Sequence, residues 1–91
     1  MTARVRMYCT RMCPYCQMAE RLLRGKQVDV EKIRVDDDPK LRLEMTHATG
    51  RTSVPQIYIG DRHIGGYREL AQLEHAGELE LLLQTPQEKT S

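Results

Sequence analysis

The sequence has no tryptophan and no phenylalanine, and its 91 residues include only three cysteines. A chain this short forms one domain with a small core, and such cores are often stabilised by disulfides or metal ions. Here all three cysteines fall between Cys9 and Cys16, so a bond between any two of them would close almost no loop. The cysteines are therefore not a disulfide scaffold.

The sequence also lacks an excess of either charge and lacks long apolar runs. Lys and Arg number 14 against 13 Asp and Glu, and the basic residues are scattered, which gives no reason to expect nucleic acid or a membrane surface as partner. No apolar run approaches the roughly 20 residues that span a bilayer. The opening stretch MTARVRMY has no apolar core of a secretory signal. We expect a monomer in the reducing cytoplasm.

Strand and helix patterns alternate along the first half of the chain, and a hairpin and two short helices follow. The strands are located by alternating side chains and β-branched residues. The helices are located by apolar residues at 3.6-residue spacing, with Pro and Gly at their ends. The expected strands are 4–8, an irregular one within 28–35, 56–59 and 62–64, and the expected helices are 14–25, 39–49, 67–74 and 79–83. This order (βαβ-α-ββ-αα) predicts an α/β domain over residues 1–83, with a four-stranded mixed sheet flanked by helices on both faces, and a polar tail over 84–91.

The stretch YCTRMCPYCQMAERLL places two cysteines at the start of the first helix. Pro14 suits a first helical turn, so Cys13 is predicted to be the N-cap, where unpaired N–H groups and the helix dipole favour an anion. We expect Cys13 to be an exposed thiolate that attacks disulfides, and Cys16, one turn inside, to be a buried thiol that resolves the product. A stabilised thiolate also leaves more easily, so the pair suits repeated thiol–disulfide exchange.

Cysteine and histidine can also bind zinc, and cysteine and methionine can simply pack in a core. A C-x-x-C pair can be half of a zinc site, but tetrahedral zinc needs four ligands, and no paired spacing links the histidines His47, His63 and His75. We therefore expect no bound metal. Cys9 shares its parity with Val5 and Met7, which predicts inert packing in the core, with an accessory redox role as the alternative. Met18 and Met45 fall at helical core spacing.

Three motifs in order resemble the dithiol glutaredoxins, most closely the small bacterial glutaredoxin-3 kind. They are CPYC after the first strand, TSVPQIYIG before the hairpin and GGYREL at a later helix, and the resemblance extends over about residues 4–83. It implies a thioredoxin fold with Pro55 in the cis form, which would bring Val54 beside the two cysteines. The Val54 backbone could then pair with a peptide-like substrate as an added strand would.

The resemblance also implies glutathione as co-substrate and assigns residues to it. Tyr15 would flank the bound sulfur, and Glu69 would hold the γ-glutamyl ammonium at the helix that follows Gly66. The family often has Lys at the position of Thr10 to hold the glycyl carboxylate, so we expect an arginine instead, with Arg51 favoured over Arg11 and Arg42. The implied glutathione-binding residues are Tyr15, Arg51, Ser53, Val54, Pro55, Gly66, Arg68 and Glu69.

The function implied is a glutathione-dependent oxidoreductase that reduces protein–glutathione mixed disulfides and protein disulfides and is regenerated by glutathione. Ribonucleotide reductase is one candidate partner that the resemblance suggests. A thioredoxin-like reductase served by a flavoprotein is a rival enzyme. A glutathione-assisted iron–sulfur carrier is an alternative of another class, although Pro14 is associated with weak cluster binding in the family.

Overall fold

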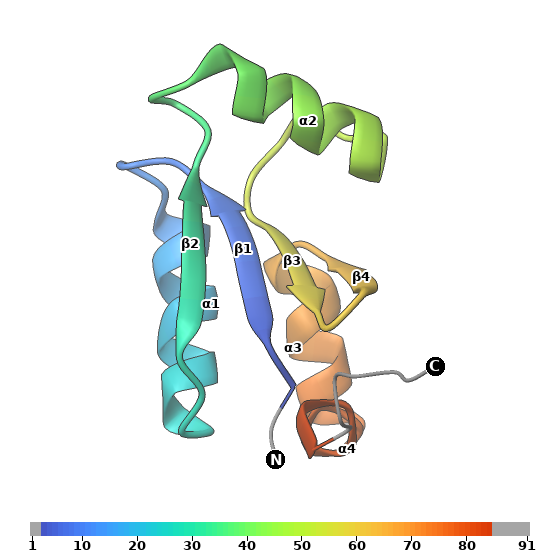
Figure 1. Ribbon diagram of the computed structural model, residues 1–91. Helices are drawn as coiled ribbons and strands as arrows, with labels where there is room; N and C mark the ends of the chain where they lie inside the picture. Colours follow the sequence, from blue (N-terminus) through green and yellow to red (C-terminus); the bar gives the residue numbers. More distant parts are fainter. Residues whose placement is uncertain (1–2, 85–91) are drawn as a thin grey trace.

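Alternation of side chains along the first strand separates two packed layers. β1 (Val5–Cys9) buries Val5, Met7 and Cys9 in one apolar cluster and Tyr8 in another, because successive residues of a strand point to opposite faces. The computed structural model describes residues 3–84, and β1 occupies a central position in its four-stranded sheet (Figure 1). The core therefore has a part on each face of the sheet.

The sheet is mixed and has the order β2-β1-β3-β4. β1 pairs in parallel with β2 (Val30–Arg34) and antiparallel with β3 (Gln56–Ile59), which pairs antiparallel with β4 (Arg62–Gly65). Tyr8, near the end of β1, is opposite Gln56, the first residue of β3. The loop that carries the cysteines therefore leaves the sheet beside the loop that precedes β3.

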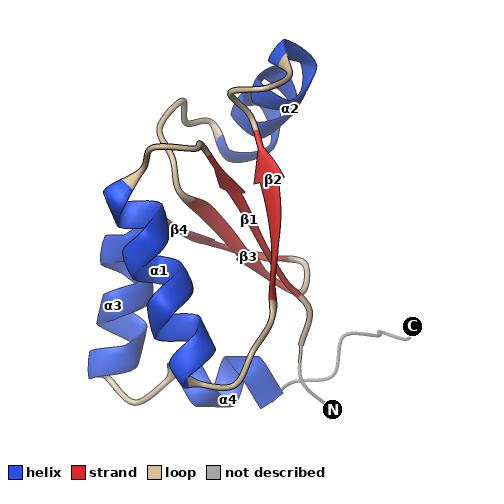
Figure 2. Cartoon of the chain, turned by 90° about the vertical axis from the view of Figure 1, so that its left-hand side faces the viewer, coloured by secondary structure: helices blue, strands red, loops and turns tan. Residues whose placement is uncertain are grey.

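Helices cover the two faces unequally. α1 (Pro14–Gly25) and α3 (Tyr67–His75) lie on one face, α4 (Leu79–Gln84) follows at their lower end, and α2 (Pro39–Thr49) lies on the other side at the opposite end (Figure 2). The larger cluster joins Met7, Leu23, Leu70 and Leu79 between the sheet and α1, α3 and α4. The smaller cluster packs Met45 of α2 against Tyr8 and Val35.

The observed architecture confirms the predicted mixed sheet with helices on both faces, and small differences have local causes. The second strand begins only at Val30, because the Val28 N–H still donates to the Leu23 carbonyl of α1 over 3.2 Å. Met45 is buried as its spacing predicts, but the prediction for Met18 was wrong, since its side chain is 38% exposed. α4 includes Gln84, which the sequence assigned to the tail, and residues 85–91 of that tail lie outside the described residues.

Candidate functional site

Cys13 caps the first helix, as predicted. Its backbone is extended (φ −130°, ψ 102°), Pro14 follows in the first turn, and its Sγ accepts a hydrogen bond from the Cys16 N–H over 3.2 Å. No acidic residue occupies the first turn of α1, so no carboxylate competes for the positive end of the helix dipole. This position stabilises negative charge on the Cys13 sulfur.

The expected exposure of Cys13 was wrong. Only 7% of the residue is exposed, because the sulfur lies in the larger apolar cluster and points to the Val54 carbonyl oxygen, 3.9 Å away. The position of Cys13 in the sequence predicted that it caps the helix. It did not predict that the loop with Val54 lies against its sulfur. A disulfide that reacts with Cys13 must therefore come into close contact with the surface around it.

Cys16 and Cys9 are both more deeply buried than Cys13. Burial, and then hydrogen bonding with the Cys13 side chain, raises the pKa of Cys16 to about 12, so Cys16 keeps its proton at neutral pH. Cys9 is 2% exposed, and burial raises its pKa as well. All three cysteines are free thiols. The helix start therefore gives an N–H donor to the sulfur of Cys13 and places a protonated thiol one turn away, while Cys9 packs in the core as expected.

The loop before β3 meets the cysteines through Val54. The Val54–Pro55 peptide bond is cis, as the resemblance implied. Arg42 of α2 donates from Nη1 to the Thr52 carbonyl over 3.2 Å, which ties this loop to α2. Arg42 therefore helps to hold the loop that carries Val54.

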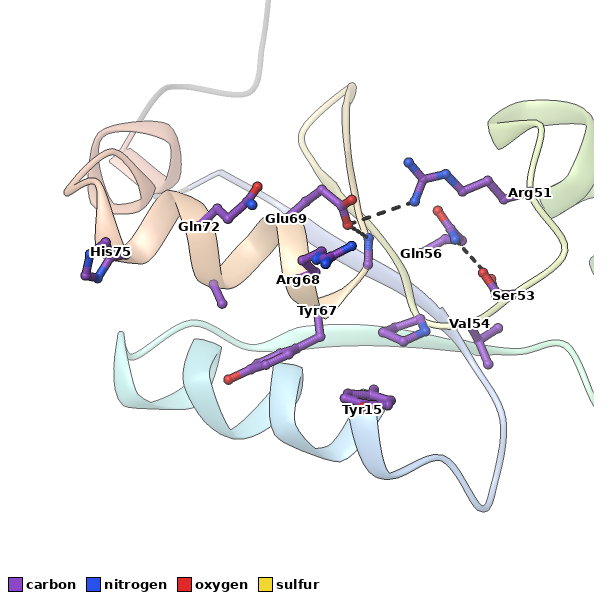
Figure 3. Close-up of a pocket in the computed structure, with 13 residues that line it drawn as sticks. Tyr15, Arg51, Ser53, Val54, Gln56, Tyr67, Arg68, Glu69, Gln72 and His75 are labelled. Carbon is purple, nitrogen blue, oxygen red and sulfur yellow. Dashed lines mark hydrogen bonds and ion pairs between the residues drawn. The ribbon is translucent and has the colours of Figure 1, made fainter.

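A groove of about 930 Å³ runs from the cysteine loop along α3 (Figure 3). All eight residues assigned to glutathione by the resemblance line it. Sequence reasoning missed five other lining residues, which are Gln56, Tyr67, Ala71, Gln72 and His75. Four of the five lie on α3. The helical spacing of α3 shows which of its residues share a side, but it does not show that this side faces a groove. Arg11 and Arg42 do not line the groove, so Arg51 is the arginine among the three candidates that does.

Glu69 has a structural contact in addition to its expected role. Its Oε1 accepts the Gly66 N–H over 2.8 Å and lies 3.9 Å from Nη1 of Arg51. The Gly66 hydrogen bond is the main cause that holds the pKa of Glu69 below its usual range, and Arg51 adds to it. Gly65 permits the contact, because its φ is +118° and a Cβ there would lie 2.9 Å from Oε1 of Glu69. Glu69 therefore presents a fixed negative charge to the groove.

Behind the groove, a buried amide joins the loop to the hairpin. Gln56 is 1% exposed, its Nε2 donates to the Ser53 carbonyl over 3.0 Å, and its Oε1 lies 2.8 Å from Nε2 of His63 on β4. Since the amide oxygen faces the imidazole, His63 donates from Nε2. Burial, with Arg51 adding to its effect, lowers the pKa of His63, which favours the neutral ring. The pair fixes the loop residue that precedes Val54.

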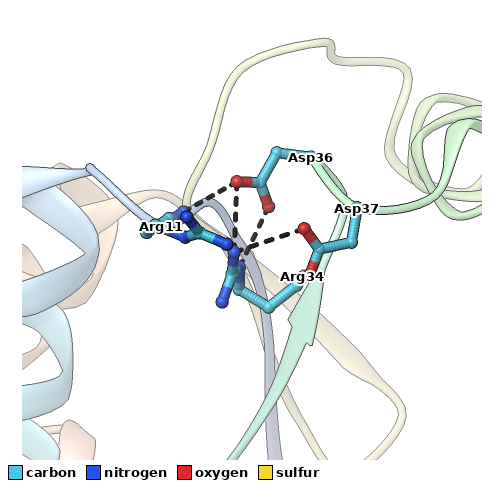
Figure 4. Close-up of polar contacts among 4 residues, drawn as sticks. All are labelled: Arg11, Arg34, Asp36 and Asp37. Atoms are coloured by element: carbon cyan, nitrogen blue, oxygen red, sulfur yellow. Dashed lines mark hydrogen bonds and ion pairs between the residues drawn. The ribbon is translucent and has the colours of Figure 1, made fainter.

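On the opposite side, an exposed carboxylate holds the cysteine loop. Asp36 accepts the Arg11 N–H over 3.1 Å and the Arg34 guanidinium over 3.0 and 3.3 Å, and Arg34 also reaches Asp37 (Figure 4). Hydrogen bonds from Arg34, and then from Arg11, lower the pKa of Asp36 to about 2. The loop before Cys13 is thereby tied to the end of β2.

The described residues hold neither a cluster of metal-binding side chains nor a helix suited to a membrane. Within residues 3–84, no three or more His, Cys, Asp and Glu side chains gather as a metal ion would need. In the same part of the chain, no helix has both the length and the apolar character to cross a bilayer.

Comparison with known proteins agrees with the fold. The glutaredoxin family model matches residues 5–64. A glutaredoxin of Pseudomonas aeruginosa is 49% identical over 76 residues, which are 84% of this chain and 90% of that protein. Glutaredoxin 3 of Escherichia coli strain K12 is 42% identical over 81 residues, 89% of this chain and 98% of that protein. The solution structure of a glutaredoxin from Brucella melitensis, 40% identical, has a TM-score of 0.82 and covers 92% of this chain and 91% of its own. The chain belongs to the glutaredoxin family.

Proposed function

We propose that the chain is a glutathione-dependent thiol–disulfide oxidoreductase that reduces protein–glutathione mixed disulfides and protein disulfides and is regenerated by glutathione. The observation that carries the proposal is the place of the Cys13 sulfur. It accepts an N–H at the start of α1 and lies 3.9 Å from the Val54 carbonyl at the end of the groove. Thiol–disulfide exchange with glutathione is the chemistry of the family to which the chain belongs.

The charges of the groove complement those of glutathione. Glutathione carries two carboxylates and one ammonium, and the groove offers the guanidinium groups of Arg51 and Arg68 and the carboxylate of Glu69. We assign the glycyl carboxylate to Arg51 and the ammonium to Glu69. A carboxylate can accept several hydrogen bonds, so Glu69 can accept from the ammonium while it accepts from Gly66. The Val54 backbone would pair with the cysteinyl residue, and Tyr15 would flank its sulfur.

Reduction of a protein–glutathione mixed disulfide requires one thiolate of the enzyme. The Cys13 thiolate attacks the glutathione sulfur, an S–S bond forms between them, and the protein thiolate leaves and takes a proton from water. A second glutathione thiolate then attacks the glutathione sulfur of the adduct. Oxidised glutathione is released, and Cys13 leaves as a thiolate, which the helix N-terminus stabilises.

Reduction of a protein disulfide requires both cysteines. Cys13 attacks one sulfur of the disulfide and the other sulfur leaves as a thiolate, so that enzyme and substrate are joined. Cys16 then gives its proton to water and attacks the Cys13 sulfur, so that a Cys13–Cys16 disulfide forms. The second substrate sulfur leaves as a thiolate and takes up a proton, which releases the reduced protein. Two glutathione molecules supply the two electrons that restore the dithiol.

A coupled assay with two electron donors tests the proposal. A glutathionylated peptide would be supplied with glutathione, glutathione reductase and NADPH in one arm, and with thioredoxin reductase and NADPH in the other. We expect rapid NADPH oxidation only in the glutathione arm. Turnover supported only by the flavoprotein would instead favour the thioredoxin-like reading of the sequence.

A further inference from the structure

Tyr58 lies on the face of the sheet that is turned away from the cysteines. Its neighbours in β3, Ile57 and Ile59, are buried in the larger apolar cluster together with Cys13, whereas Tyr58 packs against the smaller cluster. Tyr58 does not line the groove. Any influence of this side chain on a ligand in the groove must therefore pass through other residues.

Side chains from both neighbouring strands contact the Tyr58 ring. The Arg6 guanidinium carbon lies 5.1 Å from the centre of the ring, and Tyr8 meets the ring in an edge arrangement with centroids 6.3 Å apart. On the other side, the His63 ring of β4 lies 5.1 Å from Tyr58 between centroids, with the planes tilted by 37°. Arg6 and His63 are both register partners of Tyr58, so these are cross-strand pairs fixed by the sheet itself.

His63 connects Tyr58 to the loop of the groove. Its Nε2 lies 2.8 Å from Oε1 of Gln56, and Nε2 of Gln56 donates to the Ser53 carbonyl over 3.0 Å (Figure 3). A neutral imidazole carries one N–H, and the amide oxygen of Gln56 requires it on Nε2. The contact persists only while the His63 ring keeps its orientation. Since the Tyr58 ring packs against the imidazole, it restrains that orientation.

The far end of this chain of contacts is the backbone beside Cys13. Ser53 directly precedes Val54, whose carbonyl oxygen lies 3.9 Å from the Cys13 sulfur. The Gln56 side chain is 1% exposed, so water cannot readily replace the hydrogen bond that it gives to Ser53. A change in the orientation of this amide would therefore move the backbone that receives the substrate.

We propose that Tyr58 is a positioning residue for glutathione. From the far face of the sheet it orients His63, and His63 and Gln56 then hold residues 53–55 in the conformation that binds the cysteinyl part of glutathione. This inference rests on the proposed function and deepens it. Its main consequence is that a side chain in contact with neither glutathione nor the cysteines sets the KM and leaves kcat unchanged.

Three variants test the proposal. Tyr58→Leu removes the ring and keeps an apolar side chain, while Tyr58→Phe keeps the ring and loses only the hydroxyl. Leu41→Ala is the control for stability, because Leu41 packs against the same smaller cluster from α2 and does not line the groove. Steady-state kinetics with a glutathionylated peptide and glutathione are measured for each, together with the melting temperature.

We expect Tyr58→Leu to raise the KM for the glutathionylated peptide about threefold with kcat within about 1.5-fold, because binding is weakened and the reacting groups are untouched. Tyr58→Phe should restore the KM of the unmodified protein. Leu41→Ala should lower the melting temperature and leave the KM unchanged. In a protein that already carries Gln56→Leu, adding Tyr58→Leu should raise the KM no further, since the chain of contacts is already broken.

Nitrogen NMR of the His63 ring gives a readout that does not depend on turnover. The unmodified protein and Tyr58→Phe should show the tautomer with the proton on Nε2. Tyr58→Leu should show a mixture of tautomers, because the freed ring can turn away from Gln56 and bind water.

An unchanged KM in Tyr58→Leu, an equal rise of the KM in Leu41→Ala, or an unaltered His63 tautomer in Tyr58→Leu would overturn the proposal. So would a KM in the double variant with Gln56→Leu that is the product of the two separate effects. Failure of the proposed function is distinguishable from these results. In that case the unmodified protein itself would not turn over the peptide with glutathione, and the role of Tyr58 would be overturned with it.

Discussion

The two sides of Cys13 are built in different ways. On the groove side, polar groups are fixed by hydrogen bonds: Glu69 by the Gly66 N–H, and Ser53 by the buried amide of Gln56. On the side of the preceding loop, Met12 is 84% exposed and lines no part of the groove. One side is lined by fixed polar groups, and the other exposes an apolar side chain.

The side with fixed polar groups suits a ligand of constant shape. Glutathione has constant charges at constant spacing, and preorganised polar partners recognise such a ligand with little loss of entropy on binding. The predictions below test the cysteine pair, the groove and the loop that precedes Cys13.

The largest effects are expected from the two cysteine variants, and Cys16→Ser distinguishes the two substrates. Deglutathionylation needs only Cys13, so its rate should stay within about twofold, whereas the protein-disulfide reaction should slow by about tenfold or more, because an intramolecular thiol is lost. A trapped enzyme–substrate complex should accumulate on a non-reducing gel. Cys13→Ser should abolish both reactions, and equal losses in the two variants would show that the roles of the cysteines are assigned wrongly.

A smaller effect is expected from Gln56→Leu, which keeps the size of the side chain but leaves the Ser53 carbonyl and His63 without their partner. The free energy of unfolding should fall by about 1–3 kcal/mol, the cost of leaving buried polar groups unpaired. The KM for glutathionylated peptide should rise while kcat is retained, because the loop binds substrate and does not react.

His63→Gln is the matched control for this variant, since its amide can still donate to Gln56. The KM of His63→Gln should stay close to that of the unmodified protein. A Gln56→Leu protein with lower stability but an unchanged KM would show that the buried pair supports the sheet and not the binding loop.

Glu69→Gln should act on glutathione binding alone. A glutamine can still accept the Gly66 N–H, so the helix start is kept while the negative charge is lost. We expect the KM for glutathionylated substrates to rise about twofold to fivefold, as for a partly exposed ion pair. Glu69→Lys, which repels the ammonium, should raise it further. Steady-state kinetics measure the effect on binding, and melting temperatures measure any effect on stability. Unchanged kinetics in both variants would show that Glu69 does not bind glutathione.

The smallest effect is expected from Asp36→Asn, which weakens the tie between the cysteine loop and β2. The pKa of Asp36 is lowered to about 2 from an ordinary 3.8, so its charge contributes stability that is present above pH 3.8 and is lost as the pH falls through about 2. The melting temperature of Asp36→Asn should therefore be slightly lower than that of the unmodified protein at pH 7. The two values should converge towards pH 2, and a difference that does not change with pH would contradict the ion-pair explanation.

Local signals in the sequence predicted most of the fold, and the family motifs predicted eight of the thirteen residues that line the groove. Pro14 with Cys13, Asp38 with Pro39, and Gly50 mark helix ends through short-range hydrogen bonding, so helix boundaries could be read directly. The groove residues came from ordered motifs whose spacing the family shares. The expected roles of these residues towards glutathione remain predictions.

Features that depend on contacts distant in sequence were missed. The burial of Cys13 needs the Val54 loop, which is 41 residues away. The Gln56–His63 contact depends on how β3 pairs with β4, where a register irregularity occurs between Ile57 and Tyr58. Met18 matches a helical period only approximately, and the buried face of α1 runs instead through Cys16, Ala19 and Leu23.

The most direct test of the account is to locate the glutathione adduct. The Cys16→Ser protein would be incubated with oxidised glutathione, digested without reduction and mapped by mass spectrometry. Since only Cys13 lies at the helix N-terminus beside the groove, the account predicts one glutathione per chain, attached to Cys13, and none on the buried Cys9. An adduct on Cys9, or no adduct while the protein remains folded, would contradict it.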